Sequence, residues 1–236
     1  MNHYRKPTSV QGLLRLLQST VQQAGQTDGG NGALLAKRTV TAVEALLPNF
    51  AEADQAVRQA EAERRDAMVA ADATLVPLMM AVRNLRLLLR RQVRQGTLAP
   101  GILSFYAIPL TGRVSDPHRR ADWLALAEQL LAGHAQALAA GYPAAVDPAA
   151  LEAATAAMRG TLDRLQQADA ALQELRAGRT TLRDRAFQLS DEVLSELRFR
   201  LRNKPRPYVR QILRAYGLVA SRRQGEEMVD GGGVRE

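Results

Sequence analysis

The sequence predicts an all-α fold, an elongated helical bundle of the four-helix kind that contains two long helices. Strong helix formers such as alanine, leucine, arginine, glutamate and glutamine dominate its 236 residues. Aromatic residues make up only 4%, and the runs of β-branched and aromatic residues that are typical of strands are missing. Apolar residues recur every three or four positions through 51–95 and 148–203. This spacing predicts that both stretches lie lengthwise against other helices.

The first half of the chain is expected to hold a short helix, a linker and the first long helix. Thr8 or Ser9 can cap a helix that runs up to a glycine-rich linker at 27–32. A second helical segment follows the linker, and Pro48 should kink or break it. Beyond that proline the helical pattern continues to the end of the first long helix at 51–95.

The second half is expected to repeat this order of elements. The connection 97–118 carries enough apolar residues to pack on the bundle, and a helix at 120–139 follows it. Asp147 suits the N-cap of the second long helix, 148–203, because a proline follows it. Gly178 allows that helix to split in two, but the apolar stripe keeps its register there, which favours continuity. A last short helix is expected to end near residue 215.

One short motif, Ile-Leu-x-x-Tyr-[Ala/Gly]-[Ile/Leu], occurs at 102–108 and again at 212–218. Each copy comes shortly after an arginine-rich helix end, so the shared order of elements predicts an internal duplication of a short-helix/long-helix unit. The alternative is two unrelated long helices with similar ends. The expected organisation is a disordered N-terminus, two helical repeats that share one core, and a disordered tail: 1–8, 9–111, 112–219 and 220–236.

The net charge of +8 is concentrated in two segments that contain no acidic residue. Residues 73–115 hold six arginines, and residues 197–223 hold nine basic residues. Helix dipoles explain two or three cations near a helix end, but not nine without a single acid. Phosphate binding would explain the missing carboxylates, because they would repel the ligand. The candidate residues for a polyanion or an acidic partner are Arg83, Arg86, Arg90, Arg94, Arg198, Arg202, Lys204, Arg206, Arg210 and Arg214.

No pattern in the sequence points to catalysis, a cofactor or a metal site. The three histidines, at positions 3, 118 and 134, form no Glu-x-x-His or His-Glu-x-x-His motif, and no phosphate-binding glycine loop is present. The chain contains no cysteine, which removes disulfides and thiolate chemistry. We therefore expect a protein that is not an enzyme, with no cofactor, no metal and no small-molecule substrate.

These observations favour a helical bundle that acts by protein–protein association or self-assembly, as a homo-oligomer or with another protein. The first alternative is nucleic-acid binding through the arginines of 83–94 and 198–214. The second is binding to an anionic membrane surface; the most apolar window, 75–89, is too short and too charged to span a bilayer. The absence of cysteine and of a secretory signal favours a cytoplasmic location.

The end of the chain carries Tyr216-Gly217, then Ser221, an acidic pair at 226–227 and a glycine run that closes with Arg235. This ending resembles that of a group of uncharacterised bacterial all-helical proteins. They close with Tyr-Gly, a serine, an acidic pair and Gly-Gly-x-Arg. The resemblance implies a bacterial source and no catalytic activity.

Overall fold

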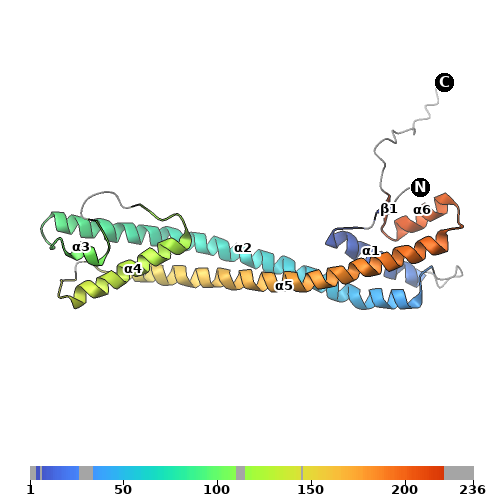
Figure 1. Cartoon of the computed structure of the whole chain (residues 1–236), viewed down its shortest axis with the longest axis horizontal. Helices are drawn as coiled ribbons and strands as arrows, with labels where there is room; N and C mark the ends of the chain where they lie inside the picture. The colour runs from blue at the N-terminus through green and yellow to red at the C-terminus, as the bar shows by residue number, and fades with distance from the viewer. Residues whose placement is uncertain (1–3, 6, 27–33, 110–114, 145, 221–236) are drawn as a thin grey trace, which may run out of the picture. The chain divides into compact units, whose positions relative to one another are not determined.

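The structure is a computed structural model that describes residues 4–5, 7–26, 34–109, 115–144 and 146–220 (Figure 1). The predicted all-α fold with two long helices is confirmed. The described residues form six helices: α1 (Val10–Gln26), α2 (Lys37–Arg94), α3 (Ile102–Phe105), α4 (Arg120–Ala139), α5 (Ala149–Leu201) and α6 (Arg206–Ala215).

Two very short strands join the two ends of the described chain. Strand β1 (Tyr4–Arg5) pairs antiparallel with β2 (Val219–Ala220), with Tyr4 opposite Ala220. At these positions the structure corrects the expected disordered N-terminus at 1–8, because backbone pairing holds two of its residues. Residues 1–3, 6 and 221–236 of the expected disordered ends lie outside the described residues.

The chain divides into two compact units, each with a hydrophobic core of its own. The terminal unit takes its described residues from 1–58 and 174–236 and contains α1, the start of α2, the end of α5 and α6. The central unit comprises the described residues of 59–173 and contains the rest of α2, α3, α4 and the start of α5. Each unit therefore combines two short helices with one end of each long helix.

This division differs from the expected halves at 9–111 and 112–219. Each unit draws helices from both halves, and two clusters of buried residues stand where one shared core was expected. The physical reason is the length of α2 and α5, which have 58 and 53 residues. Each pair of short helices adds its apolar residues to the stretches of α2 and α5 in its own unit, so each unit buries a separate cluster.

In the central unit, leucines of α2 pack against α3, α4 and α5. Leu78, Val82 and Leu89 of α2 are fully buried, as are Ile102 of α3 and Leu130 of α4. The hydroxyl of Thr74 lies 2.9 Å from that of Thr161, and Arg64 pairs with Asp169. These two pairs show that α2 and α5 run antiparallel within this unit.

In the terminal unit, leucines of α1 and α5 and the aromatic ring of Phe50 fill the core. Both carboxylate oxygens of Glu196 accept hydrogen bonds at the start of α2, at 2.7 Å from the amide of Ala36 and at 2.6 Å from the hydroxyl of Thr39. Asp54, only 4% exposed, pairs with Arg58 and lies 3.1 Å from Arg179. These contacts fix the register of α2 and α5 within the unit.

The structure decides two questions of helix continuity. Helix α5 passes through Gly178 without a break, which confirms the preferred prediction. Helix α2 also passes through Pro48, so of the kink or break expected there the break is wrong. Pro48 is exposed, while Phe50 and Val43 on either side are fully buried. Burial of these flanking side chains outweighs the one backbone hydrogen bond that the proline removes.

The two copies of the tyrosine motif adopt the same turn. Ala107 and Gly217 both have positive φ, at 50° and 74°. The amide of Ile108 donates to the carbonyl of Leu103, and that of Leu218 donates to Leu213, both at 3.0 Å. In both copies the amide bonds to the carbonyl five residues earlier. Such a hydrogen bond is typical of a helix C-terminus and satisfies one of the last carbonyls of the helix. The tyrosine before each turn is buried, Tyr106 in the central unit and Tyr216 in the terminal unit.

Candidate partner-binding surfaces

The first group of predicted site residues lies on α2 in the central unit and is largely engaged within the chain. The guanidinium of Arg83 lies 2.6 Å from the carboxylate of Asp116 and 5.6 Å from the centre of the Trp123 ring. Arg86 lies 3.9 Å from the same carboxylate. Asp116 is the first residue after the acid-free segment, so the segment's own composition did not reveal this partner.

Burial also makes part of this group less accessible to a ligand. The side chain of Arg86 is only 13% exposed, and burial lowers its pKa, with Asp116 opposing and Arg90 adding to the shift. Arg90 donates a hydrogen bond to the carbonyl of Pro109 at 3.1 Å. Arg94, at the end of α2, is exposed. The arginines at 83, 86 and 90 therefore attach the connection after α3 to α2.

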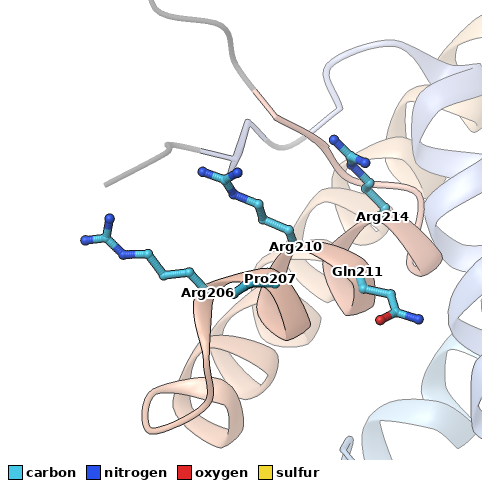
Figure 2. Close-up of a pocket in the computed structure, with 5 residues that line it drawn as sticks. All are labelled: Arg206, Pro207, Arg210, Gln211 and Arg214. Atoms are coloured by element: carbon cyan, nitrogen blue, oxygen red, sulfur yellow. The ribbon is translucent and has the colours of Figure 1, made fainter. Parts of the chain in front are cut away.

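The second group presents a different surface, along α6 in the terminal unit. Arg206, Arg210 and Arg214 occur at every fourth position, so they fall on one side of the helix. All three are exposed, and with Pro207 and Gln211 they line a shallow hollow of about 600 Å³. Figure 2 shows their guanidinium groups pointing away from the helix. Within the described residues, no ion pair is formed by these three side chains.

The backbone of α6 adds to this positive potential. Arg206 is the first residue of the helix, Lys204 precedes it, and the first turn has no acidic residue. The N-terminus of a helix carries a partial positive charge and normally attracts carboxylates or phosphates. Cations at this end are therefore unfavourable for the isolated helix. A dipole argument accounts for Arg214 in the last turn, but it does not account for Arg206.

The end of α5 and the turn after it extend the same basic region. Arg198, Arg202 and Lys204 are exposed, and the guanidinium of Arg202 lies 4.7 Å from the centre of the Phe199 ring. Phe199 itself is 62% exposed. Tyr208 is partly buried against the core of the terminal unit. The structure thus places all six predicted residues of the second group in one unit, with their charges accessible.

A further surface on α2 was missed by the sequence reasoning. Val69, Val76, Met80 and Leu87 are 64%, 61%, 52% and 66% exposed. Their spacings of seven, four and seven place them within an arc of about 40°, opposite the buried face that carries Leu78 and Val82. We call these four residues the outer stripe. The signal was present as a second apolar periodicity in the same helix, but only the buried periodicity was interpreted.

Helix α2 is also the candidate for a membrane span among the described residues. By length and composition it could cross a bilayer, with a mean hydropathy of 1.3 over an 18-residue window of which 22% is buried. The expectation that residues 75–89 are too short and too charged to span a bilayer therefore stays a prediction. Core helices of soluble proteins pass the same test, so the finding is weak evidence for a span.

Within the described part of the chain, no group of three or more histidine, aspartate or glutamate side chains is arranged to hold a metal ion. Comparison of the chain with models of protein families, with curated proteins and with solved structures finds no match.

Proposed function

We propose that this chain is a non-enzymatic helical-bundle protein that works by associating with protein partners. The outer stripe carries the proposal. Its four large apolar side chains lie in a row on a helix whose opposite face already fills the core of the central unit. A helix that is apolar on two faces is normally covered on both, because exposed apolar rows favour contact with another surface.

Comparison of two variants in an affinity capture from the native cells tests this function. Val76→Glu/Met80→Glu places two charges in the outer stripe, and Ala70→Glu places one on an exposed position of α2 outside it. We expect the double variant to lose the proteins, or additional copies of the chain, that the unchanged chain and Ala70→Glu retain. Equal recovery by all three chains would contradict the proposal.

A second candidate function is binding of a nucleic acid or another polyanion, and the arginines of α6 favour it. Three exposed guanidinium groups on one side of a helix, at an N-terminus without acids, provide the charge and spacing that phosphates would contact. Arg198, Arg202 and Lys204 would extend the contact. The arginines of α2 contribute less to this candidate, because Asp116 and the carbonyl of Pro109 engage them.

Titration of DNA and RNA oligonucleotides at several salt concentrations tests this candidate. We expect affinity to fall steeply with salt, by a logarithmic slope of about −0.9 per phosphate contacted. Replacing the three α6 arginines with glutamine should reduce the slope by about three. Replacement of three exposed arginines elsewhere, Arg38, Arg119 and Arg164, is the charge-matched control. No binding at low salt would remove this candidate.

We also infer that the chain contains an internal duplication. The matching turns after α3 and α6 support it, since Leu103, Tyr106 and Ile108 are buried like Leu213, Tyr216 and Leu218. Exchanging the segments 102–108 and 212–218 tests the equivalence. The exchanged chain should keep its helical content and unfold within about 1–2 kcal/mol of the original, the range of conservative core changes. Scrambled segments should abolish folding. The same loss of folding in the exchanged chain would count against the duplication.

A further inference from the structure

The outer stripe has a symmetry that points to a particular partner. Its residues lie at 69, 76, 80 and 87, so the spacings are seven, four and seven in either direction along the chain. The centre of this pattern is position 78. When two copies of α2 lie antiparallel and cross at this level, Val69 of each copy is level with Leu87 of the other. Val76 is then level with Met80.

Two pairs of residues next to the outer stripe fit the same register by size. Position 73 becomes level with 83, so Ala73 faces the long side chain of Arg83. Position 62 becomes level with 94, so Ala62 faces Arg94. All four residues are exposed in the single chain. Small side chains opposite large ones allow two helices to approach closely at these two levels.

Charge complementarity favours antiparallel over parallel packing of the two α2 helices. Residues 61–73 carry four acids and two arginines, whereas residues 83–94 carry five arginines and no acid. Some of these groups form ion pairs within the chain, Asp72 with Arg120 and Arg83 and Arg86 with Asp116. Exposed charges outside these pairs keep the same contrast, with Glu63 and Asp66 in the first segment and Arg91 and Arg94 in the second. An antiparallel pair sets the net acidic segment of one copy against the basic segment of the other. Exposed Asp66, for example, is then level with position 90 and next to Arg91, while exposed Arg65 is level with Arg91 and offsets part of this attraction. Two parallel helices would place their basic segments side by side, and these segments would repel each other.

From these observations we propose that the outer stripe is the interface of a homodimer in which two α2 helices pack antiparallel about residue 78. This inference rests on the proposed association function and names the partner as a second copy of the chain. Over 69–87 the seam is about 27 Å long at 1.5 Å per residue. The basic region of α6 lies in the other compact unit and is not part of this interface.

The first test is the mass of the full chain by sedimentation equilibrium over a range of concentrations. We expect a monomer–dimer equilibrium. In Val76→Glu/Met80→Glu the dimer dissociation constant should rise by about 100-fold or more, because carboxylates are buried next to apolar side chains. Ala70→Glu, on an exposed position outside the stripe, should leave it unchanged. Circular dichroism checks that each variant keeps its helices.

The second test measures the register of the two helices. Because the chain contains no cysteine, a single introduced cysteine can form a disulfide only with the other copy. Val69→Cys and Leu87→Cys are made singly, tagged with different masses, mixed and oxidised. The antiparallel register predicts a disulfide between the two different variants in preference to either variant with itself. A parallel pair predicts the reverse. Predominant disulfides within each variant would overturn the inference.

The outcomes separate this inference from the proposed function. A chain that is monomeric at every concentration overturns the homodimer. If its outer stripe still governs capture of another protein, the association function stands. If the monomer instead binds vesicles of phosphatidylglycerol with phosphatidylcholine, but not phosphatidylcholine alone, and the double variant does not, the stripe is a membrane surface and both proposals fail.

Discussion

The hydroxyl oxygen of Tyr106 lies 2.8 Å from Nδ1 of His134, and both side chains are buried in the central unit. This hydrogen bond joins the turn after α3 to the middle of α4. A hydroxyl and a neutral imidazole can each donate or accept, so the pair satisfies two polar groups that the core would otherwise leave without a partner. The turn and α4 are thereby held in one relative position.

Replacement of Tyr106 by phenylalanine should lower the stability of the central unit by about 1–3 kcal/mol, because Nδ1 of His134 is left buried without a partner. Urea unfolding followed by the fluorescence of Trp123 measures this, since the single tryptophan is buried in the same unit. In a His134→Leu background the same replacement should cost much less. An equal cost in both backgrounds would show that the hydrogen bond contributes nothing.

Two glycines within helices should respond in opposite directions to alanine. A Cβ at Gly133 would lie 2.3 Å from the carbonyl oxygen of Phe105, so Gly133→Ala must separate α3 from α4. At Gly178 a Cβ would meet nothing within 4 Å, and Gly178→Ala should stabilise α5 by up to about 1 kcal/mol. Thermal unfolding of the two variants compares them. A neutral Gly133→Ala would disprove the close approach of α3 and α4.

The two equivalent turns make a matched pair of substitutions. Ala107 has a φ of 50°, which costs an L-residue about 1 kcal/mol, so Ala107→Gly should stabilise the protein slightly. Gly217→Ala should destabilise it, because φ is 74° and the added Cβ would lie 3.3 Å from the hydroxyl of Ser19. Denaturant midpoints at a constant m-value report both changes. Shifts of the same sign would contradict the equivalence of the turns.

Alkaline pH should destabilise the protein through its two buried tyrosines. Burial raises the pKa of Tyr106 and of Tyr216 above the usual value of about 10. The folded state therefore retains protons that the unfolded state releases, so stability is unaffected below about pH 9 and falls as the pH rises through 10 and beyond. Ultraviolet titration of tyrosinate, with the Tyr106→Phe/Tyr216→Phe double variant as control, measures this. A double variant with an unchanged alkaline decline would refute the assignment.

Much of the secondary structure could be predicted from local sequence. Ser9 accepts a hydrogen bond from the amide of Gly12 at 3.1 Å, as an N-cap should, and Asp147 accepts one from Ala149 at 2.9 Å. The boundaries of α4 match the predicted range 120–139. These caps depend on residues two or three positions apart, which meet at the start of a helix regardless of the rest of the chain.

The candidate sites were less predictable, because charge runs do not reveal their partners. The two acid-free segments looked alike in sequence, yet Asp116 engages Arg83 and Arg86, whereas the α6 arginines have no such neighbour among the described residues. The outer stripe could not be predicted from the sequence for a related reason. A helix with two apolar periodicities does not indicate by itself which one faces the core.

The sequence alone determined that the chain is helical, where most helices begin and end, and that its charge is uneven. Helix propensity, capping and turn residues act over a few positions, so they can be read from the sequence. Only the tertiary structure decided that the helices form two units with separate cores, that α2 continues through Pro48, and which faces remain exposed. Those outcomes depend on contacts between residues far apart in the chain, where burial of whole side chains outweighs local preference.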